Sequence, residues 1–170
     1  MSGRHENVIF SSDPVPKVDR RVIEDLKRKA AASPARTVRL CLHRSIDDPV
    51  QEMIIVHSHG AYIRPHKHDH ETESFHVLDG AMLVVLLDDE GGEIERFRMA
   101  DLSSGSPCVC RLATGRWHMM IPLTDQVVFL ETTQGPFRGA EHNTFAPWAP
   151  SPDDGPGIVR FLKRYSQDPE

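Results

Sequence analysis

Histidine is concentrated in one short stretch of this sequence. The chain has 170 residues and 10 histidines, and six of them lie between residues 57 and 76: His57, His59, His66, His68, His70 and His76. An even distribution would put about one histidine there. Clustered histidine is typical of metal binding, of proton transfer near neutral pH or of a pH-dependent switch. Because the cluster is internal and mixed with other residue types, it is not a terminal affinity tag.

Two of these histidines have the spacing of metal ligands on a β-strand. His66 and His68 are separated by one residue, so on an extended strand both side chains project from the same face. After a short reversal, Glu73 begins the next expected strand and can lie beside the pair. Two imidazoles and a carboxylate form a facial set for a divalent ion with coordination positions left open. His118, which follows a turn further along the chain, can complete this set from across the fold.

The same residues resemble the first sequence motif of the cupins. That motif is a glycine, five residues, His-x-His, four residues, Glu, six residues and a glycine, and Gly60 and Gly80 stand at its two ends. The resemblance implies a jelly-roll β-barrel. It also implies one divalent metal ion held by the four residues already singled out: His66, His68, Glu73 and His118.

The second cupin motif is present only in part. Gly115 and His118 match its Gly-x-x-His, which supports His118 as a ligand. Ala113 stands where proline is usual in that motif, and Pro122 stands where asparagine is usual. These departures concern the geometry of the loop around the motif.

Longer segments look like the WbuC family of cupin-fold metalloproteins. The similarity runs from about the N-terminal helix to residue 150 and includes the segments LCLHRS (40–45), DDPVQ (47–51), YIRPH (62–66), ESFHV (73–77), ETTQGPF (131–137) and FAPWAP (145–150). Members of that family are bacterial and are often encoded among genes for surface polysaccharide (O-antigen). The resemblance therefore implies a sugar or sugar nucleotide as substrate, and it carries over no particular reaction.

Several functions are compatible with this ligand set. The metal is Fe, Mn, Ni or Zn, since availability often decides which ion occupies such a site. In an enzyme it acts as a Lewis acid on a substrate oxygen pair or, if it is iron, activates O₂, so isomerisation and dioxygenation are both open. The alternatives are a non-catalytic module that binds a carbohydrate or carboxylate, a metal-independent protein like the sugar epimerases, and a purely structural metal.

Four more residues are candidates for the surroundings of the metal. Tyr62 and Arg64 share the parity of His66 on a regular strand, and an arginine there suits a carboxylate, phosphate or sugar-nucleotide group, so we expect both in substrate binding. His57 and His59 lie at the end of the preceding expected strand and are candidates for acid–base groups or for residues that support the ligands.

The elements that must position these residues are mainly strands. Apolar residues recur at helical spacing from about residue 16 to 32, with Asp13 or Asp19 as the expected N-cap. Beyond Pro34 the period changes to two, which predicts strands near residues 37–43, 50–57, 61–68, 72–78, 81–87, 93–99, 108–112, 117–121 and 127–131. Strands at this spacing favour an antiparallel sandwich or barrel.

These elements predict one domain in three parts. An N-terminal arm and helix cover residues 1–34, a β-barrel covers residues 35–132, and an irregular C-terminal tail covers residues 133–170. Pro and Gly are frequent in that tail, and Phe137, Phe145, Trp148 and Phe161 are spread along it. Aromatic residues in an irregular segment indicate a tail that packs on the barrel.

Composition excludes several other classes. The net charge is −5 and the pI is about 6.0, so no electrostatic feature favours nucleic acid or an anionic membrane. No apolar run approaches the roughly 18 residues of a membrane span, and the N-terminal residues lack the apolar core of a secretory signal. Three cysteines do not suggest a disulfide framework. We expect a cytoplasmic protein that binds a small molecule, and the cupin resemblance implies a homodimer.

Overall fold

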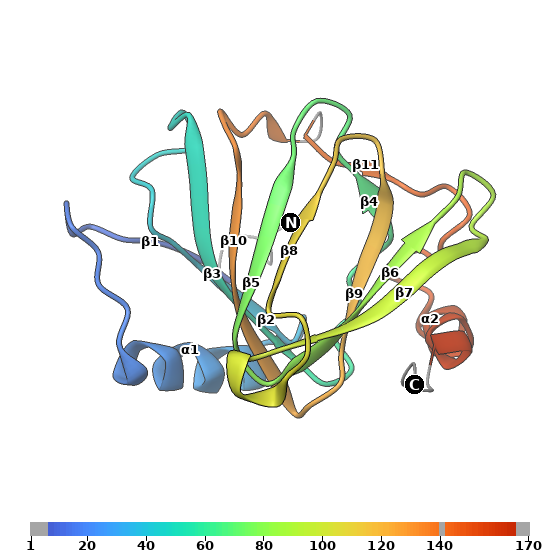
Figure 1. The fold of residues 1–170 in the computed structure, drawn as a ribbon, viewed down its shortest axis with the longest axis horizontal. Coiled ribbons are helices and arrows are strands. Elements are labelled where there is room, and N and C mark those ends of the chain that lie inside the picture. Colours follow the sequence, from blue (N-terminus) through green and yellow to red (C-terminus); the bar gives the residue numbers. More distant parts are fainter. Residues whose placement is uncertain (1–6, 140–141, 166–170) are drawn as a thin grey trace.

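The strand-rich sequence folds into two sheets that face each other (Figure 1). The structure is a computed structural model, and it describes residues 7–139 and 142–165. The six-stranded sheet has the order β1-β2-β3-β10-β5-β8 and the five-stranded sheet the order β11-β4-β9-β6-β7. The strands are β1 (Val8–Phe10), β2 (Thr37–Cys41), β3 (Val50–Ser58), β4 (His66–Lys67), β5 (Glu73–Asp79), β6 (Ala81–Leu87), β7 (Glu93–Ala100), β8 (Val109–Leu112), β9 (Trp117–Pro122), β10 (Gln126–Gln134) and β11 (Thr144–Phe145).

This architecture confirms a mainly β jelly roll with an N-terminal helix. Each of the nine predicted strand regions contains a strand. In the described part of the chain, however, the hydrogen-bonding pattern gives two separate sheets and not one closed barrel. The fold is therefore a jelly-roll sandwich.

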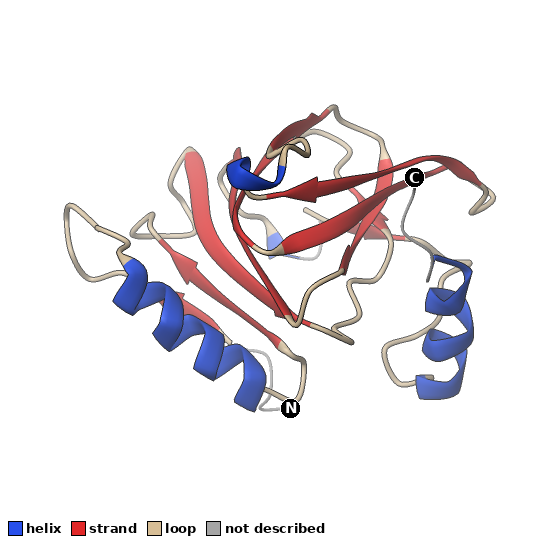
Figure 2. Ribbon diagram, turned by 60° about the horizontal axis from the view of Figure 1, so that its bottom comes forward, coloured by secondary structure: helices blue, strands red, loops and turns tan. Residues whose placement is uncertain are grey.

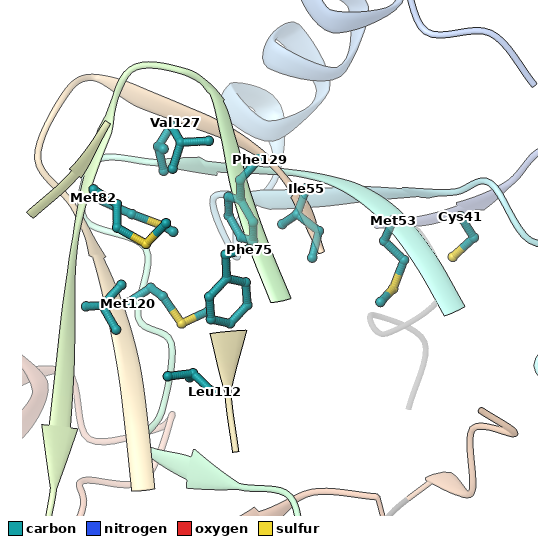
Figure 3. Packing of buried hydrophobic residues seen from close by; sticks show 12 residues of the cluster. Cys41, Met53, Ile55, Phe75, Met82, Leu112, Met120, Val127 and Phe129 are labelled. Atoms are coloured by element: carbon teal, nitrogen blue, oxygen red, sulfur yellow. The ribbon is translucent and has the colours of Figure 1, made fainter. Parts of the chain in front are cut away.

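The main core lies between the two sheets (Figure 3). Alternate residues of each strand point into it, so Phe75 and Val77 of β5 are 0% and 2% exposed while His76 between them is exposed. Across the core, Met82 and Met120 of the five-stranded sheet belong to the same cluster.

A helix covers the outer face of each sheet (Figure 2). Helix α1 (Arg20–Ala32) buries Leu26 and Ala30 against the six-stranded sheet. Of the two expected N-caps, Asp19 is the one used, and its Oδ1 accepts bonds from the backbone N–H of Arg21 and Val22, both at 3.0 Å.

The C-terminal tail is more regular than its composition predicts. It contains β11 and helix α2 (Gly155–Leu162), whose Asp154 N-cap accepts a bond from the Gly157 N–H at 2.9 Å. Phe161 and Tyr165 pack on the outer face of the five-stranded sheet together with Trp117. An N-cap Asp followed by Pro156 is a helix-start signal, so the sequence did contain evidence for α2.

The segment before the predicted ligands is less regular than its pattern predicts. Residues 61–65 form no strand, and only His66 and Lys67 pair as β4. Gly60 has φ +81°, which turns the chain after β3, and Pro65 has no N–H to donate to a neighbouring strand. No helix in the described residues has the length and apolar character that a membrane crossing requires.

Candidate metal centre

Strand pairing brings the four predicted ligands together between the sheets. His66 of β4 is the registered partner of His118 in β9, both in the five-stranded sheet. Glu73 is the first residue of β5 in the six-stranded sheet. His68 directly follows β4, and its carbonyl accepts a bond from the Gly115 N–H at 2.7 Å, which holds it beside the turn before β9.

The ligand atoms of these residues converge. One ligand atom from each of His66, His68, Glu73 and His118 lies within 4.8 Å of all the others. Oε1 of Glu73 is 2.6 Å from Nε2 of His118, and Oε2 of Glu73 is 3.2 Å from Nε2 of His68. Glu73 and His118 are 3% and 1% exposed, so this meeting point is shielded from bulk water.

The backbone selects which histidine nitrogens are free. Nδ1 of His66 donates to the carbonyl of Arg64 at 2.9 Å, and Nδ1 of His118 donates to the carbonyl of Arg116 at 2.9 Å. Nδ1 of His68 donates to the carbonyl of His142 at 3.0 Å. A neutral imidazole that donates through Nδ1 presents a lone pair at Nε2, which is the form that binds metal.

The free atoms at the centre have no partners of their own. Nε2 of His68, Nε2 of His118 and Oε1 of Glu73 are buried without a hydrogen-bond partner. Acceptor atoms that face one another at short distance repel unless a cation or a proton lies between them. Three imidazole nitrogens and one carboxylate oxygen therefore fit a divalent transition-metal ion.

The pKa values of these residues reflect two opposing effects, burial and the charges of neighbouring ligand residues. Burial opposes ionisation of Glu73, but the positive charges of His118 and His68 outweigh it and lower the pKa of Glu73. Burial also disfavours protonation of His68, but the Glu73 carboxylate outweighs this and raises the pKa of His68 to about 9. Burial, reinforced by His118, lowers the pKa of His66 to about 3. The protein without metal thus holds a proton where a cation is expected.

Residues 61–65 form no strand, so strand parity does not relate Tyr62 and Arg64 to His66. The Tyr62 hydroxyl donates to the carbonyl of Pro150 at 3.0 Å, and the ring packs against the outer cluster of the five-stranded sheet. Arg64 donates to the carbonyl of Ala146 at 2.9 Å. Both side chains hold the C-terminal tail, and their role in substrate binding stays a prediction.

The structure places His57 and His59 away from the four ligands. His57 is registered with Val127 of β10, whereas Glu73 is registered with Thr133, and six residues along a strand span about 20 Å. The Nδ1 of His57 is 2.8 Å from Oγ1 of Thr37. His59 is exposed in the turn after β3. Neither belongs to the group of converging ligands, because the end of β3 that carries them lies far along the sheet from Glu73.

Three residues beside the centre were missed from the sequence: Glu71, Glu131 and His142. His142 and Glu71 form a second cluster with His68, in which Nδ1 of His142 is 3.6 Å from Oε1 of Glu71. Glu131 of β10 faces the interior near Glu73. His142 lies in the tail, far from the ligands in sequence, so no spacing pattern points to it.

Comparisons with known proteins support the fold more strongly than any function. A family model described as "Domain of unknown function (DUF6016)" matches residues 18–99, which include His66, His68 and Glu73 but not His118. No curated protein sequence matches the chain.

Similar solved structures include CapF with the inhibitor 3-isopropenyl-tropolone, with a TM-score of 0.51, 16% identity, and coverage of 64% of this chain and 30% of CapF. The Cnp3 cupin domain of Schizosaccharomyces pombe aligns with a TM-score of 0.46 and 18% identity over 58% of this chain and 64% of that one. Bacillus subtilis oxalate decarboxylase, a protein with Mn(II) centres, aligns with a TM-score of 0.46 and 15% identity over 58% and 24%. Each alignment covers less than two thirds of the other chain.

Together, the jelly roll and its similar structures define a protein with the cupin fold. Within that fold, the His and Glu residues form a group suited to a divalent metal ion.

Proposed function

We propose that this protein is a metal-dependent enzyme of the WbuC type that acts on a sugar or sugar nucleotide. One divalent ion is held by His66, His68, Glu73 and His118. The single observation that carries the metal is the set of buried, unpartnered atoms that face one another at its centre. The sugar substrate and the link to surface polysaccharide rest on the sequence similarity to the WbuC family.

A bound metal ion would supply Lewis acidity to a substrate oxygen, or redox chemistry if it is iron. The surrounding chain has three tasks in this function. Three backbone carbonyls fix the imidazole rings, and the Glu73 carboxylate offsets the positive charge of the ion. Burial of His118 and Glu73 excludes bulk water, which strengthens electrostatic interactions at the centre.

The test is elemental analysis of untagged protein purified without a chelator. We expect about one equivalent of Fe, Mn, Ni or Zn in the wild type and loss of that metal in His68→Ala, because three remaining ligands hold an ion far less tightly. His76→Ala is the matched control, since His76 lies on β5 three residues from Glu73 but is exposed on the opposite face.

Two results would contradict this function. Equal metal content in His68→Ala and wild type would show that the ion is bound elsewhere. Absence of stoichiometric metal from the wild type, even after reconstitution, would favour the metal-independent sugar epimerase interpretation and make His66 a candidate base.

A further inference from the structure

Two charged residues lie on the inner face of the six-stranded sheet, beside the candidate metal centre. Strand register places Glu131 of β10 between Met53 of β3 and Phe75 of β5. Met53 and Phe75 both belong to the core between the sheets (Figure 3). Because Glu131 is registered between them, its side chain points into the same interior. Arg39 of β2 shares this direction with Cys41, another core residue two positions along the same strand.

Glu131 lies near the metal ligands, and Arg39 lies beyond it on the same inner face. Glu73 is registered with Thr133 and Glu131 with Phe75, so the two carboxylates occupy diagonal positions on adjacent strands, about 7–8 Å apart at the backbone. Nη1 of Arg39 is 3.9 Å from Sδ of Met53, the direct cross-strand neighbour of Glu131. The guanidinium therefore lies next to Glu131 along the inner face.

Within the part of the chain that the structure describes, neither charge has a direct ion-pair contact, although the nearby Arg39 favours the ionised form of Glu131. No carboxylate there lies within ion-pair distance of Arg39, and no hydrogen bond reaches the carboxylate of Glu131. Both side chains are half-buried, and charges away from bulk water are normally paired or hydrogen-bonded. Burial and then the negative charge of Glu73 raise the pKa of Glu131 to about 7, an environment typical of a functional site.

The sum of the charges at this place indicates the charge that a ligand must carry. A divalent ion and Arg39 carry three positive charges, while ionised Glu73 and Glu131 carry two negative charges. One positive charge remains, and a single carboxylate neutralises it. Arginine is suited to that task because its planar guanidinium binds a carboxylate through two parallel hydrogen bonds.

We propose that Arg39 anchors the carboxylate of a small carboxylic acid on the inner face of the six-stranded sheet, beside the metal centre. Glu131 flanks this subsite and limits it to ligands with little negative charge. The inference rests on the proposed function for the position of the metal ion, which would supply positive charge beside the subsite. It assigns recognition of the anion to Arg39 and not to Arg64, which donates to the carbonyl of Ala146.

The experiment is calorimetric titration of Zn-loaded protein with the hydroxy monocarboxylates glycolate, lactate and 3-hydroxybutyrate at pH 8, where each carries one negative charge, with metal content measured for each variant. At least one of these acids should bind the wild type, and Arg39→Met should weaken it by about tenfold or more, through loss of a charged bidentate pair. Arg36→Met, which removes an exposed arginine that donates to the carbonyl of His59, is the matched control and should bind within about twofold of wild type. Arg64→Met is measured beside it. Glu131→Gln should bind more tightly, because a negative charge beside the ligand is removed.

The outcomes separate this inference from the proposed function. Unchanged binding in Arg39→Met, loss of binding in Arg64→Met alone, or no binding of any acid to metal-loaded wild type would overturn the inference and leave the metal centre standing. If the protein takes up no metal, the proposed function fails. The same titration of metal-free protein then decides the inference, since binding that depends on Arg39 supports it and no binding overturns it.

A folding defect in Arg39→Met is checked by circular dichroism. If that variant is unfolded, Arg39→Lys replaces it, since lysine keeps the charge but lacks the planar fork. Weaker binding by Arg39→Lys supports the inference, and wild-type binding by it overturns the bidentate anchor.

Discussion

At the scale of single side chains, the backbone decides how the candidate ligands present themselves. Each of the three histidines donates its Nδ1 proton to a carbonyl, and for His68 that carbonyl belongs to His142, 74 residues further along the chain. A ring held in this way has lost rotational freedom before any ion arrives, which lowers the entropic cost of binding.

His57 gives a prediction about acid stability. Burial, reinforced by the charge of Arg39, lowers its pKa from 6.5 to about 3. Between these values the unfolded chain binds a proton that the folded protein does not, so the free energy of unfolding falls as pH falls, by up to about 1.4 kcal/mol per pH unit. In His57→Gln this contribution is absent, and its stability should fall less steeply from pH 6.5 to 4.

The measurement is urea unfolding of both proteins across that pH range, performed without added metal. Parallel pH profiles would show that His57 is protonated in the folded protein and would contradict the buried neutral ring. His76→Ala, which removes an exposed histidine, should follow the wild-type profile.

The ligands could be predicted from the sequence because three of them lie close together along the chain. The alternation of His66 and His68 and the short reversal before Glu73 place three ligands within eight residues, and the structure brings all three together with His118. Arg39 and Glu131 were missed because their proximity to the centre depends on the register of four strands. A register that joins distant parts of the chain leaves no spacing signal in a single sequence.

At the scale of elements, α1 depends on its N-terminal cap. Asp19→Ala removes the acceptor for two backbone N–H groups, and we expect a loss of about 1 kcal/mol in the free energy of unfolding. Asp13→Ala, at the other predicted cap position, should change stability by less than about 0.5 kcal/mol, because the Asp13 carboxylate accepts a bond from the Val15 N–H in an exposed turn and caps no helix. Urea unfolding measures both, and equal losses would contradict the assignment.

Strands with a strong local apolar pattern were predicted well. Strands that form only because they pair with a distant part of the chain were not. The uninterrupted apolar run in residues 81–87 predicts β6 with its observed bounds, because both faces of that strand are buried. Strand β11 has two residues and exists because Thr144 and Phe145 pair with β4, which no local pattern specifies. The turn at Gly60 and the missing N–H of Pro65 outweighed the strand pattern in residues 61–65.

At the scale of the whole molecule, the candidate centre joins the two sheets. Glu73 comes from the six-stranded sheet, and His66 and His118 come from the five-stranded sheet. An ion bound only by the folded protein stabilises it by about 4 kcal/mol when its concentration is a thousandfold above the dissociation constant. For a chain of this size, that corresponds to an unfolding temperature higher by on the order of 10 °C.

Chelation should therefore lower the unfolding temperature of metal-loaded wild type by about that amount. Thermal unfolding followed by circular dichroism, with and without EDTA, measures the effect. His68→Ala should show no shift. A shift of equal size in both proteins would mean that EDTA acts at another site.

Because the ligands come from two facing sheets, the spacing of the sheets limits the size of ion that all of them can reach. The ring of Phe75 lies 6.3 Å from that of His118 and is fully buried. A larger ion must push the layers apart and open voids around such close-packed side chains, which a protein interior resists. The apolar core around Phe75 would therefore limit how far Glu73 and the two strand histidines could separate around an ion, although none of these apolar side chains is a ligand.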